Sequence, residues 1–177
     1  MDSTNWKITH SKDVYQNPHF KIVQQVVVRP DGTDAAYYTL VRRSDFSIII
    51  PLTEQGETYL VGQYRIATQS FSWEFPMGGV DDKEPLDIAK QELIEETGLT
   101  AKIWKELGWF YVANGHTNQK GYVYLAQKLT KGEAQPEAGE FLEIKKVPIK
   151  QIGLMIHQGE ITDGPTICAY HYYIVSK

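Results

Sequence analysis

The pattern of apolar and polar residues predicts a strand-rich first third of the chain. Residues 22–28 and 37–41 are rich in β-branched and aromatic side chains, which favour strands. The tripeptide Pro30-Asp31-Gly32 lies between them and is typical of a turn. We therefore predict a β-hairpin in this region.

Two further strands are expected at residues 46–52 and 59–64. They flank a polar loop, and we expect them to form a second strand pair. A short strand at 73–75 would then lead into a tight turn at Gly78 and Gly79.

A helix is predicted from about residue 85 to residue 97. Pro85 suits the first turn of a helix, and Gly98 suits its end. One face of the segment carries an apolar stripe, formed by Leu86, Ala89 and Leu93.

The second half of the chain contains three more expected strands and two more expected helices. The strands are at 104–113, 122–129 and 141–147. One helix starts near Pro148 and ends before Gly159; the other has Thr162 or Asp163 as its cap and Pro165 in its first turn. Mixed strands with three helices are typical of an α+β fold or of an α/β/α layered domain.

Composition and charge narrow the class of protein. The 177 residues are enough for one domain with a substantial core, and the net charge of -4 gives no general attraction to nucleic acid or to an anionic membrane. Cys168 is the single cysteine, which excludes an internal disulfide and fits a reducing compartment. The polar amino terminus lacks the apolar core of a secretion signal, and no apolar run approaches the length of a membrane span. We expect a cytoplasmic protein that binds neither nucleic acid nor membrane.

Three acidic residues stand close together at the end of the predicted central helix. Glu92, Glu95 and Glu96 precede Gly98, and helical spacing brings their carboxylates onto neighbouring positions. Like charges repel, and acidic groups in a last turn oppose the helix dipole. A solvated acidic surface is the plainer alternative, but the complete run of glycine turn, helix, acids and Gly-Leu favours a divalent cation as the compensation. Oxygen ligands of this kind suit magnesium or manganese.

The same segment resembles the Nudix box, whose pattern is Gly, five residues, Glu, seven residues, then Arg-Glu-aliphatic-x-Glu-Glu-x-Gly-aliphatic. Residues 91–99 read QELIEETGL and match the second half, apart from Gln91, which stands where the family has arginine. Six residues separate Glu84 from Gln91, so the box is one residue short. Gln91 lacks the charge of arginine but can still donate a hydrogen bond. A similar shortened box with Glu-Pro occurs in GDP-mannose-type Nudix hydrolases, so we interpret both departures as marks of a subfamily.

The resemblance extends beyond the box. The run Gln63-Tyr64-Arg65 and the segment WEFPMG at 73–78 are similar to ADP-ribose and nucleoside-diphosphate-sugar pyrophosphohydrolases. This resemblance implies the Nudix fold, a mixed β-sheet in an α/β/α sandwich with an N-terminal antiparallel strand extension. Residues 1–45 would form the extension, through which relatives dimerise, and residues 46–177 would form the hydrolase domain. A homodimer is therefore expected.

Carried over by position, the resemblance also implies a metal site and a phosphate contact. Glu92, Glu96 and the backbone carbonyl of Met77 would surround Mg²⁺, with Mn²⁺ as an alternative. Arg65 would grip the diphosphate, as guanidinium groups do with phosphate oxygens, although a surface ion pair is the plainer alternative. Glu74 would bind a sugar hydroxyl or support the metal ligands, or else would be an exposed strand residue.

Further roles fall on residues around this centre. Phe46 would stack on the base, with a core position as the alternative, and His116 lies in a loop that would face the substrate. Glu95 would be an outer ligand or would orient a neighbour. The general base in this subfamily is a glutamate on a mobile loop; the candidates are Glu133, Glu137 and Glu140, and we choose Glu140 because it enters a strand as the family's loop does.

The expected reaction is attack of a metal-activated water on a nucleoside diphosphate linked to another group, giving a nucleoside monophosphate and a phosphorylated product. ADP-ribose hydrolases commonly carry a proline about fifteen residues after the box, where this chain has Asn114. This difference favours a broader choice of nucleoside diphosphate sugar, GDP-mannose included. The alternatives are a Nudix hydrolase of nucleoside triphosphates or dinucleoside polyphosphates, and a non-catalytic module that binds a nucleotide sugar.

Overall fold

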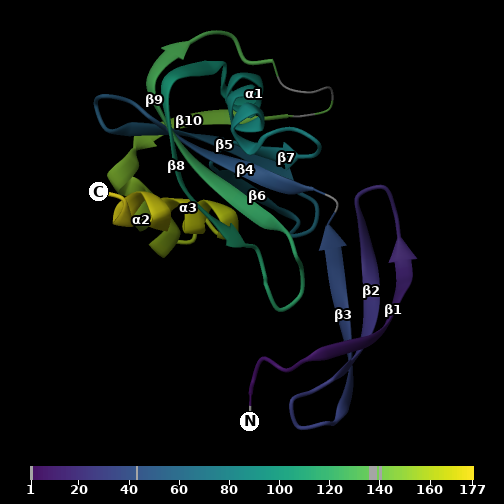
Figure 1. Cartoon of the computed structure of the whole chain (residues 1–177). Coiled ribbons are helices and arrows are strands. Elements are labelled where there is room, and N and C mark those ends of the chain that lie inside the picture. Colours follow the sequence, from purple (N-terminus) through teal and green to yellow (C-terminus); the bar gives the residue numbers. More distant parts are fainter. Residues whose placement is uncertain (1, 43, 136–138, 140) are drawn as a thin grey trace. The chain divides into compact units, whose positions relative to one another are not determined.

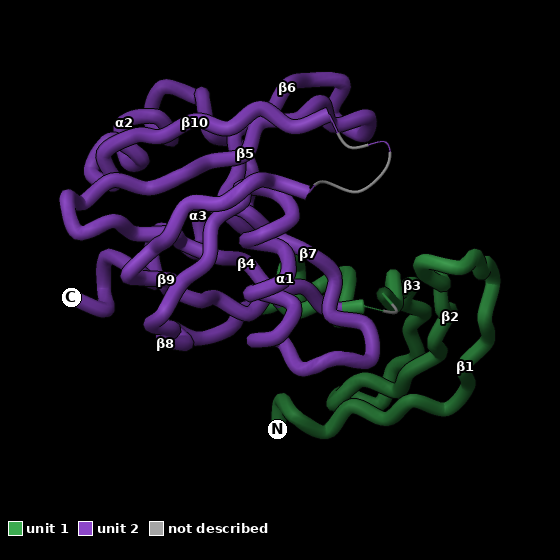
Figure 2. The backbone as a smooth tube through the Cα atoms, turned by 90° about the horizontal axis from the view of Figure 1, so that it is seen from above, with its two compact units in different colours: residues 1–44, 111–120 green, residues 45–110, 121–177 purple. Residues whose placement is uncertain are grey.

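The computed structural model describes residues 2–42, 44–135, 139 and 141–177. Its chain forms two compact units, shown in green and purple in Figure 2. Unit 1 comprises residues 1–44 and 111–120, and unit 2 comprises residues 45–110 and 121–177.

Unit 1 is built on a three-stranded antiparallel sheet in the order β1-β2-β3. Its strands are β1 (Lys7–Gln16), β2 (Phe20–Val28) and β3 (Asp34–Arg42). β2 and β3 form the expected hairpin, and the turn between them is closed by Gly32 in the left-handed region with φ of 85°. β1 was not predicted, because its sequence is mostly polar and it is exposed along its whole length. It forms as a strand by pairing its backbone with β2.

The chain enters unit 1 a second time at residues 111–120. The amide of Leu40 donates to the carbonyl of His116 at 2.8 Å, and the amide of Arg42 donates to Asn118 Oδ1 at 3.0 Å. The loop at 111–120 is therefore hydrogen-bonded to β3 within unit 1. Such contacts between distant segments are not visible in local sequence patterns.

Unit 2 contains a mixed sheet with the order β10-β5-β4-β9-β8, in which β6 also pairs with β5 and β7 with β4 (Figure 1). β4 runs parallel to β9, whereas it is antiparallel to β5 and β7. The strands that carry this sheet are β4 (Asp45–Leu52), β5 (Glu57–Arg65), β6 (Ser70–Glu74), β7 (Met77–Val80), β8 (Leu99–Tyr111), β9 (Lys120–Lys131) and β10 (Glu143–Pro148).

Of two local expectations about this sheet, one is confirmed over a short length and one was wrong. β4 and β5 are antiparallel neighbours but pair only at Leu52 and Thr58, because β7 pairs with the first half of β4. β4 is a continuous apolar run whose long partner is β9. Such a continuous apolar run is typical of a strand covered on both faces. Gly78 and Gly79 do not form a turn but belong to β7, where they pair with Ser47 and Phe46.

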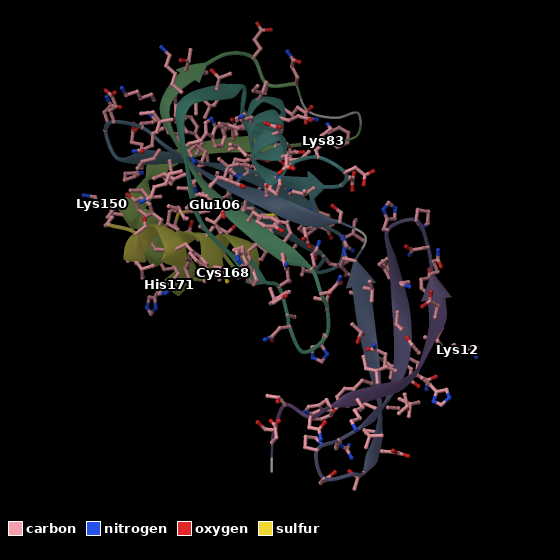
Figure 3. All side chains as sticks on the ribbon, viewed as in Figure 1. Lys12, Lys83, Glu106, Lys150, Cys168 and His171 are labelled. Carbon is pink, nitrogen blue, oxygen red and sulfur yellow. The ribbon has the colours of Figure 1, made fainter. Side chains whose placement is uncertain are left out.

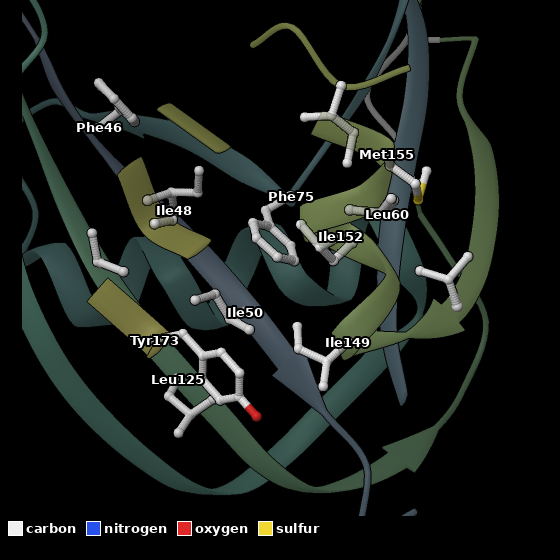
Figure 4. Packing of buried hydrophobic residues seen from close by; sticks show 14 residues of the cluster. Phe46, Ile48, Ile50, Leu60, Phe75, Leu125, Ile149, Ile152, Met155 and Tyr173 are labelled. Atoms are coloured by element: carbon white, nitrogen blue, oxygen red, sulfur yellow. The ribbon is translucent and has the colours of Figure 1, made fainter. Parts of the chain in front are cut away.

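Helices cover both faces of the sheet. They are α1 (Pro85–Thr97), the short 3₁₀ helix η1 (Ile149–Gln151), α2 (Ile152–His157) and α3 (Gly164–Val175). Ile49 packs with Ala89 and Leu93 of α1 in one core. Ile48 and Ile50, which point to the opposite face of β4, pack with η1, α2 and α3 in the other core (Figure 4). The α+β fold with a mixed sheet between helical layers is confirmed.

The boundaries of the helices agree with their sequence signals. α1 begins at Pro85 and ends at Thr97, and the cap residue Gly98 has φ of 70° and donates its amide to the carbonyl of Ile94. α3 begins after Asp163, whose side chain accepts the amide of Thr166 at 2.8 Å. In the part of the chain that the structure describes, no helix has the length and apolar character needed to cross a membrane.

Candidate active site

The last two turns of α1 hold Glu92 and Glu96 against β7. Glu96 is 5% exposed, and its Oε2 accepts the amide of Met77 at 3.0 Å. Glu92 is half-buried and lies so close to Gly78 that a Cβ at this position would overlap its carboxylate. Both expected metal-binding side chains therefore lie against β7, Glu96 at Met77 and Glu92 at Gly78.

Glycine at position 78 explains why the two elements approach so closely. Because Gly78 has no side chain, the carboxylate of Glu92 occupies the space over the β7 backbone. A polar pocket of about 360 Å³ opens beside it. The pocket is lined by Met77, Gly78, Gly79, Asp81, Lys83, Ile88, Gln91 and Glu92.

The donor atoms at this place fit a hard divalent cation. Two carboxylates and a peptide group are oxygen-rich, and such sets suit Mg²⁺ or Mn²⁺. Within the described residues, no group of three or more His, Cys, Asp and Glu side chains converges in a metal-binding arrangement. The donors expected at this place are Glu92, Glu96 and the main chain at Met77, of which the structure brings both carboxylates to β7.

Arg65 and Glu74 form a paired unit on adjacent strands β5 and β6. Arg65 Nε donates to Glu74 Oε1 at 2.9 Å, and Nη2 of the same guanidinium donates to Oε2. Glu74 is 1% exposed, whereas the Arg65 side chain is 42% exposed. Glu74 is thus not an exposed strand residue: it fixes the arginine, and the guanidinium still reaches solvent. Its hydrogen bonds to Arg65 raise the pKa of the guanidinium, which remains a permanent cation.

Asp163 is a nearby acidic group whose setting sequence analysis missed. Burial raises the pKa of its carboxyl group, and the charge of Glu74 adds to this effect, while hydrogen bonds from Thr166 and the charge of Arg65 oppose it. Thr166 also accepts the amide of Phe75 at 3.0 Å, so the start of α3 is fixed to the segment that follows Glu74. The sequence indicated Asp163 only as a helix cap, because its proximity to Arg65 depends on the packing of α3.

Gln91 links two charged side chains along α1. Its Nε2 donates to Glu95 Oε1 at 3.0 Å, and its Oε1 accepts from Lys83 Nζ at 2.8 Å. Lys83 lies in the segment before α1, directly before Glu84. The residue that the box lacks falls between Glu84 and Gln91, within α1. The contact of Gln91 with Glu95 joins positions four residues apart on one helix and agrees with the expected donor role of Gln91. The contact with Lys83 was not predicted, because it depends on how the segment before α1 folds back along the helix.

Two other expected substrate contacts have different surroundings. Phe46 is 8% exposed and packs edge-to-face against Phe110 at 6.0 Å between ring centroids. This packing corresponds to the core position that the sequence left open as an alternative to base stacking. His116 is exposed and belongs to the 111–120 loop of unit 1.

The segment that follows β9 is hydrogen-bonded to the end of α1. The amide of Gly132 donates to the carbonyl of Gly98 at 2.7 Å, and the amide of Gln135 donates to the carbonyl of Glu95 at 3.0 Å. Glu133, one of the candidate bases, is exposed within this segment. Glu137 and the preferred Glu140 lie outside the described residues, so the choice of Glu140 stays a prediction.

The chain is similar to known proteins along most of its length. Residues 41–170 match the family described as NUDIX domain, and residues 6–40 match the nucleoside diphosphate sugar hydrolase N-terminal domain. A solved structure titled ADP compounds hydrolase superposes with a TM-score of 0.85 at 19% identity, covering 95% of this chain and 91% of that one. That likeness supports the same fold.

Two curated relatives align along most of their length. The ADP-ribose pyrophosphatase of Bacillus subtilis (strain 168) is 26% identical over 175 residues, which cover 97% of this chain and 94% of that one. The GDP-mannose pyrophosphatase of Citrobacter koseri is 26% identical over 184 residues and covers 94% of each. The NUDIX match spans most of the chain and includes the box, α1 and β7. The chain therefore belongs to the Nudix family of hydrolases.

Proposed function

We propose that this hydrolase cleaves the diphosphate bond of a nucleoside diphosphate sugar such as ADP-ribose or GDP-mannose. The products are a nucleoside monophosphate and a sugar phosphate. The observation that carries the proposal is the placement of Glu92 and Glu96 against Met77 and Gly78 of β7. The match of residues 6–40 to the N-terminal domain of nucleoside diphosphate sugar hydrolases supports this substrate class.

In this proposal Glu92, Glu96 and the main chain at Met77 would hold Mg²⁺ or Mn²⁺. A divalent cation in such a site supplies charge neutralisation for the diphosphate and lowers the pKa of a bound water. Arg65 contacts a phosphate through the part of its guanidinium that Glu74 leaves open to solvent. Because Glu74 is buried, it holds the guanidinium in one orientation before substrate arrives.

The remaining roles are those of the general base, of Glu95 and of the residues that contact the nucleoside. We assign the general base to Glu140, because it precedes β10 in a segment whose first residues are hydrogen-bonded to the end of α1. Glu95 orients the neighbouring glutamates. The contact of His116 with the nucleoside stays a prediction, and the packing of Phe46 against Phe110 favours a core role for Phe46 over base stacking. With Asn114 in place of the proline typical of ADP-ribose hydrolases, we expect more than one nucleotide sugar to be accepted.

We further propose that the protein acts in the cytoplasm as a homodimer formed through the extension at residues 1–45. The single cysteine, Cys168, suits a reducing compartment. The exposed strand β1 supports the dimer, since an edge strand of a three-stranded sheet presents unpaired backbone groups.

The test is a panel of nucleotide sugars, nucleoside triphosphates and dinucleoside polyphosphates, incubated with Mg²⁺ in heavy-oxygen water and analysed by mass spectrometry. We expect turnover of nucleotide sugars, with the heavy oxygen in one of the two phosphorylated products. Preferential turnover of triphosphates or dinucleoside polyphosphates would refute the substrate class. Binding of nucleotide sugars without turnover would instead indicate a non-catalytic module.

The variant Glu96→Gln tests whether the site on α1 is responsible for hydrolysis. The substitution keeps the shape of a buried side chain but removes its charge, and we expect the rate to fall roughly a thousandfold, as when a central electrostatic group is lost. Glu54→Gln, in an exposed loop of unit 2, is the matched control and should keep the wild-type rate. An unchanged rate for Glu96→Gln in a folded protein would remove the catalytic assignment.

A further inference from the structure

Lys83 forms a hydrogen bond with Gln91 but has no role in the function proposed above. Lys83 Nζ lies 2.8 Å from Gln91 Oε1, and Gln91 Nε2 lies 3.0 Å from Glu95 Oε1. The three side chains thus form a line from the segment before α1 to its last turn. Figure 3 shows Lys83 beside the start of this helix.

The amide of Gln91 has one donor end and one acceptor end, and its neighbours decide which end faces Glu95. A carboxylate can only accept, so Gln91 stabilises Glu95 only when its NH₂ group points toward it. An ammonium can only donate, so Lys83 holds the oxygen of the amide on the opposite side. Lys83 therefore fixes the orientation in which Gln91 donates to Glu95.

Lys83 also brings a positive charge to a region crowded with carboxylates. It lines the same pocket as Gly78, Gln91 and Glu92. A cation on this wall reduces the repulsion among Glu92, Glu95 and Glu96, which a neutral glutamine at position 91 cannot do alone.

Helix stability does not explain a lysine at this position. Lys83 directly precedes Glu84, the residue that caps the start of α1. A positive charge near the N-terminus of a helix opposes the helix dipole. The lysine is better explained by its hydrogen bond to Gln91 on α1.

We propose that Lys83 is a positioning residue of the active site, which acts through Gln91 to orient Glu95 and supplies the positive charge that position 91 lacks in this chain. This inference rests on the proposed function, because Glu95 is significant only beside a metal-binding pair. Lys83 before α1 and the neutral Gln91 within α1 are then two parts of one arrangement.

A double-mutant cycle tests this coupling. Lys83→Met, Gln91→Arg and the double variant are compared with the wild type in the full-length protein. Mn²⁺ affinity of the metal-free protein is measured by calorimetry, and kcat and KM are measured at several Mg²⁺ concentrations. Thermal unfolding of each variant verifies that it is folded.

We expect Lys83→Met to weaken Mn²⁺ binding and to lower kcat by about tenfold, the lower end for an outer partner of a metal site, because Lys83 is exposed. KM should change little, since Lys83 acts on the glutamates rather than on the substrate. Lys83→Arg should retain most of the activity. In the Gln91→Arg background the loss caused by Lys83→Met should be small, because an arginine at 91 carries its own charge to Glu95.

Lys90→Met is the matched control, since Lys90 lies on α1 but pairs with Asp87 at 3.1 Å. It should leave metal affinity and kcat unchanged. The proposal is wrong if Lys83→Met behaves like this control, or if it causes the same loss in both backgrounds. If the wild type hydrolyses no nucleotide sugar, the proposed function fails on its own, and the Mn²⁺ titrations still decide the role of Lys83.

Discussion

At the scale of single residues, the position of Glu92 depends on the missing side chain at Gly78. In Gly78→Ala the new Cβ would displace the Glu92 side chain, which is flexible enough to move to another rotamer. We expect a loss of stability of about 1 kcal/mol, typical of a side chain forced away from its preferred rotamer. Activity should fall roughly a hundredfold, because a catalytic group displaced by about 1 Å loses that much.

Gly164→Ala is a suitable control, since a Cβ there meets no atom within 4 Å. Unfolding monitored by circular dichroism and Mn²⁺ titration separate the two effects. Unchanged Mn²⁺ affinity and activity in Gly78→Ala would show that Glu92 is not a metal ligand.

The same scale shows what sequence reasoning can and cannot find. Glu92 and Glu96 were predictable because helical periodicity fixes their spacing, whatever the rest of the chain does. The contacts of Lys83 with Gln91 and of Glu74 with Arg65 were not predictable, because each joins side chains from two elements. Their geometry depends on packing that no local pattern encodes.

At the scale of elements, Asp163 both caps the start of α3 and lies close to Arg65. Burial raises the pKa of Asp163 above its usual value of 3.8, so folding favours the protonated form. Protonation of Asp163 therefore contributes fully to the free energy of unfolding when the pH is below the pKa of this group in the unfolded chain. The contribution is lost as the pH rises through its pKa in the folded protein. Asp163→Asn cannot ionise but keeps an oxygen that can accept the amide of Thr166.

We therefore expect Asp163→Asn to gain stability relative to the wild type as the pH rises from about 3 toward neutrality. Urea unfolding at several pH values measures this difference. Asp87→Asn, which removes an exposed carboxylate from α1, controls for the change in net charge. A difference between wild type and Asp163→Asn that is constant with pH would contradict the expected linkage.

Elements themselves were predictable to different degrees. α1 and α3 agreed with expectation because Pro85, Gly98 and Asp163 are local start and stop signals. β1 was missed because nothing in its polar sequence requires burial, and its conformation comes from pairing with β2. Gly78 and Gly79 were expected to form a turn, but their backbone pairs with β4 and forms a strand. Gly78 also lies against Glu92 of α1.

At the scale of the whole molecule, the strand extension accounts for the proposed homodimer. Several large side chains of unit 1 are exposed: Trp6, which precedes β1, and Ile8, Tyr15, Tyr37 and Tyr38 on the sheet. Tyr38 lies directly across from Gln24 of β2, and its hydroxyl accepts from Gln24 Nε2 at 2.9 Å. Exposed aromatic groups of this kind are enriched where proteins associate.

We expect sedimentation at micromolar concentration to give about twice the 20.2 kDa of one chain. Tyr38→Glu should weaken the dimer at least about tenfold, since an added charge at an interface must be desolvated. Because Tyr38 is 59% exposed in the single chain, its replacement should leave the folding of the monomer intact. Leu154→Glu, at a similarly exposed position on α2, should have no effect on association. A monomer in the wild type, or an equal effect of the two substitutions, would show that association does not depend on this sheet.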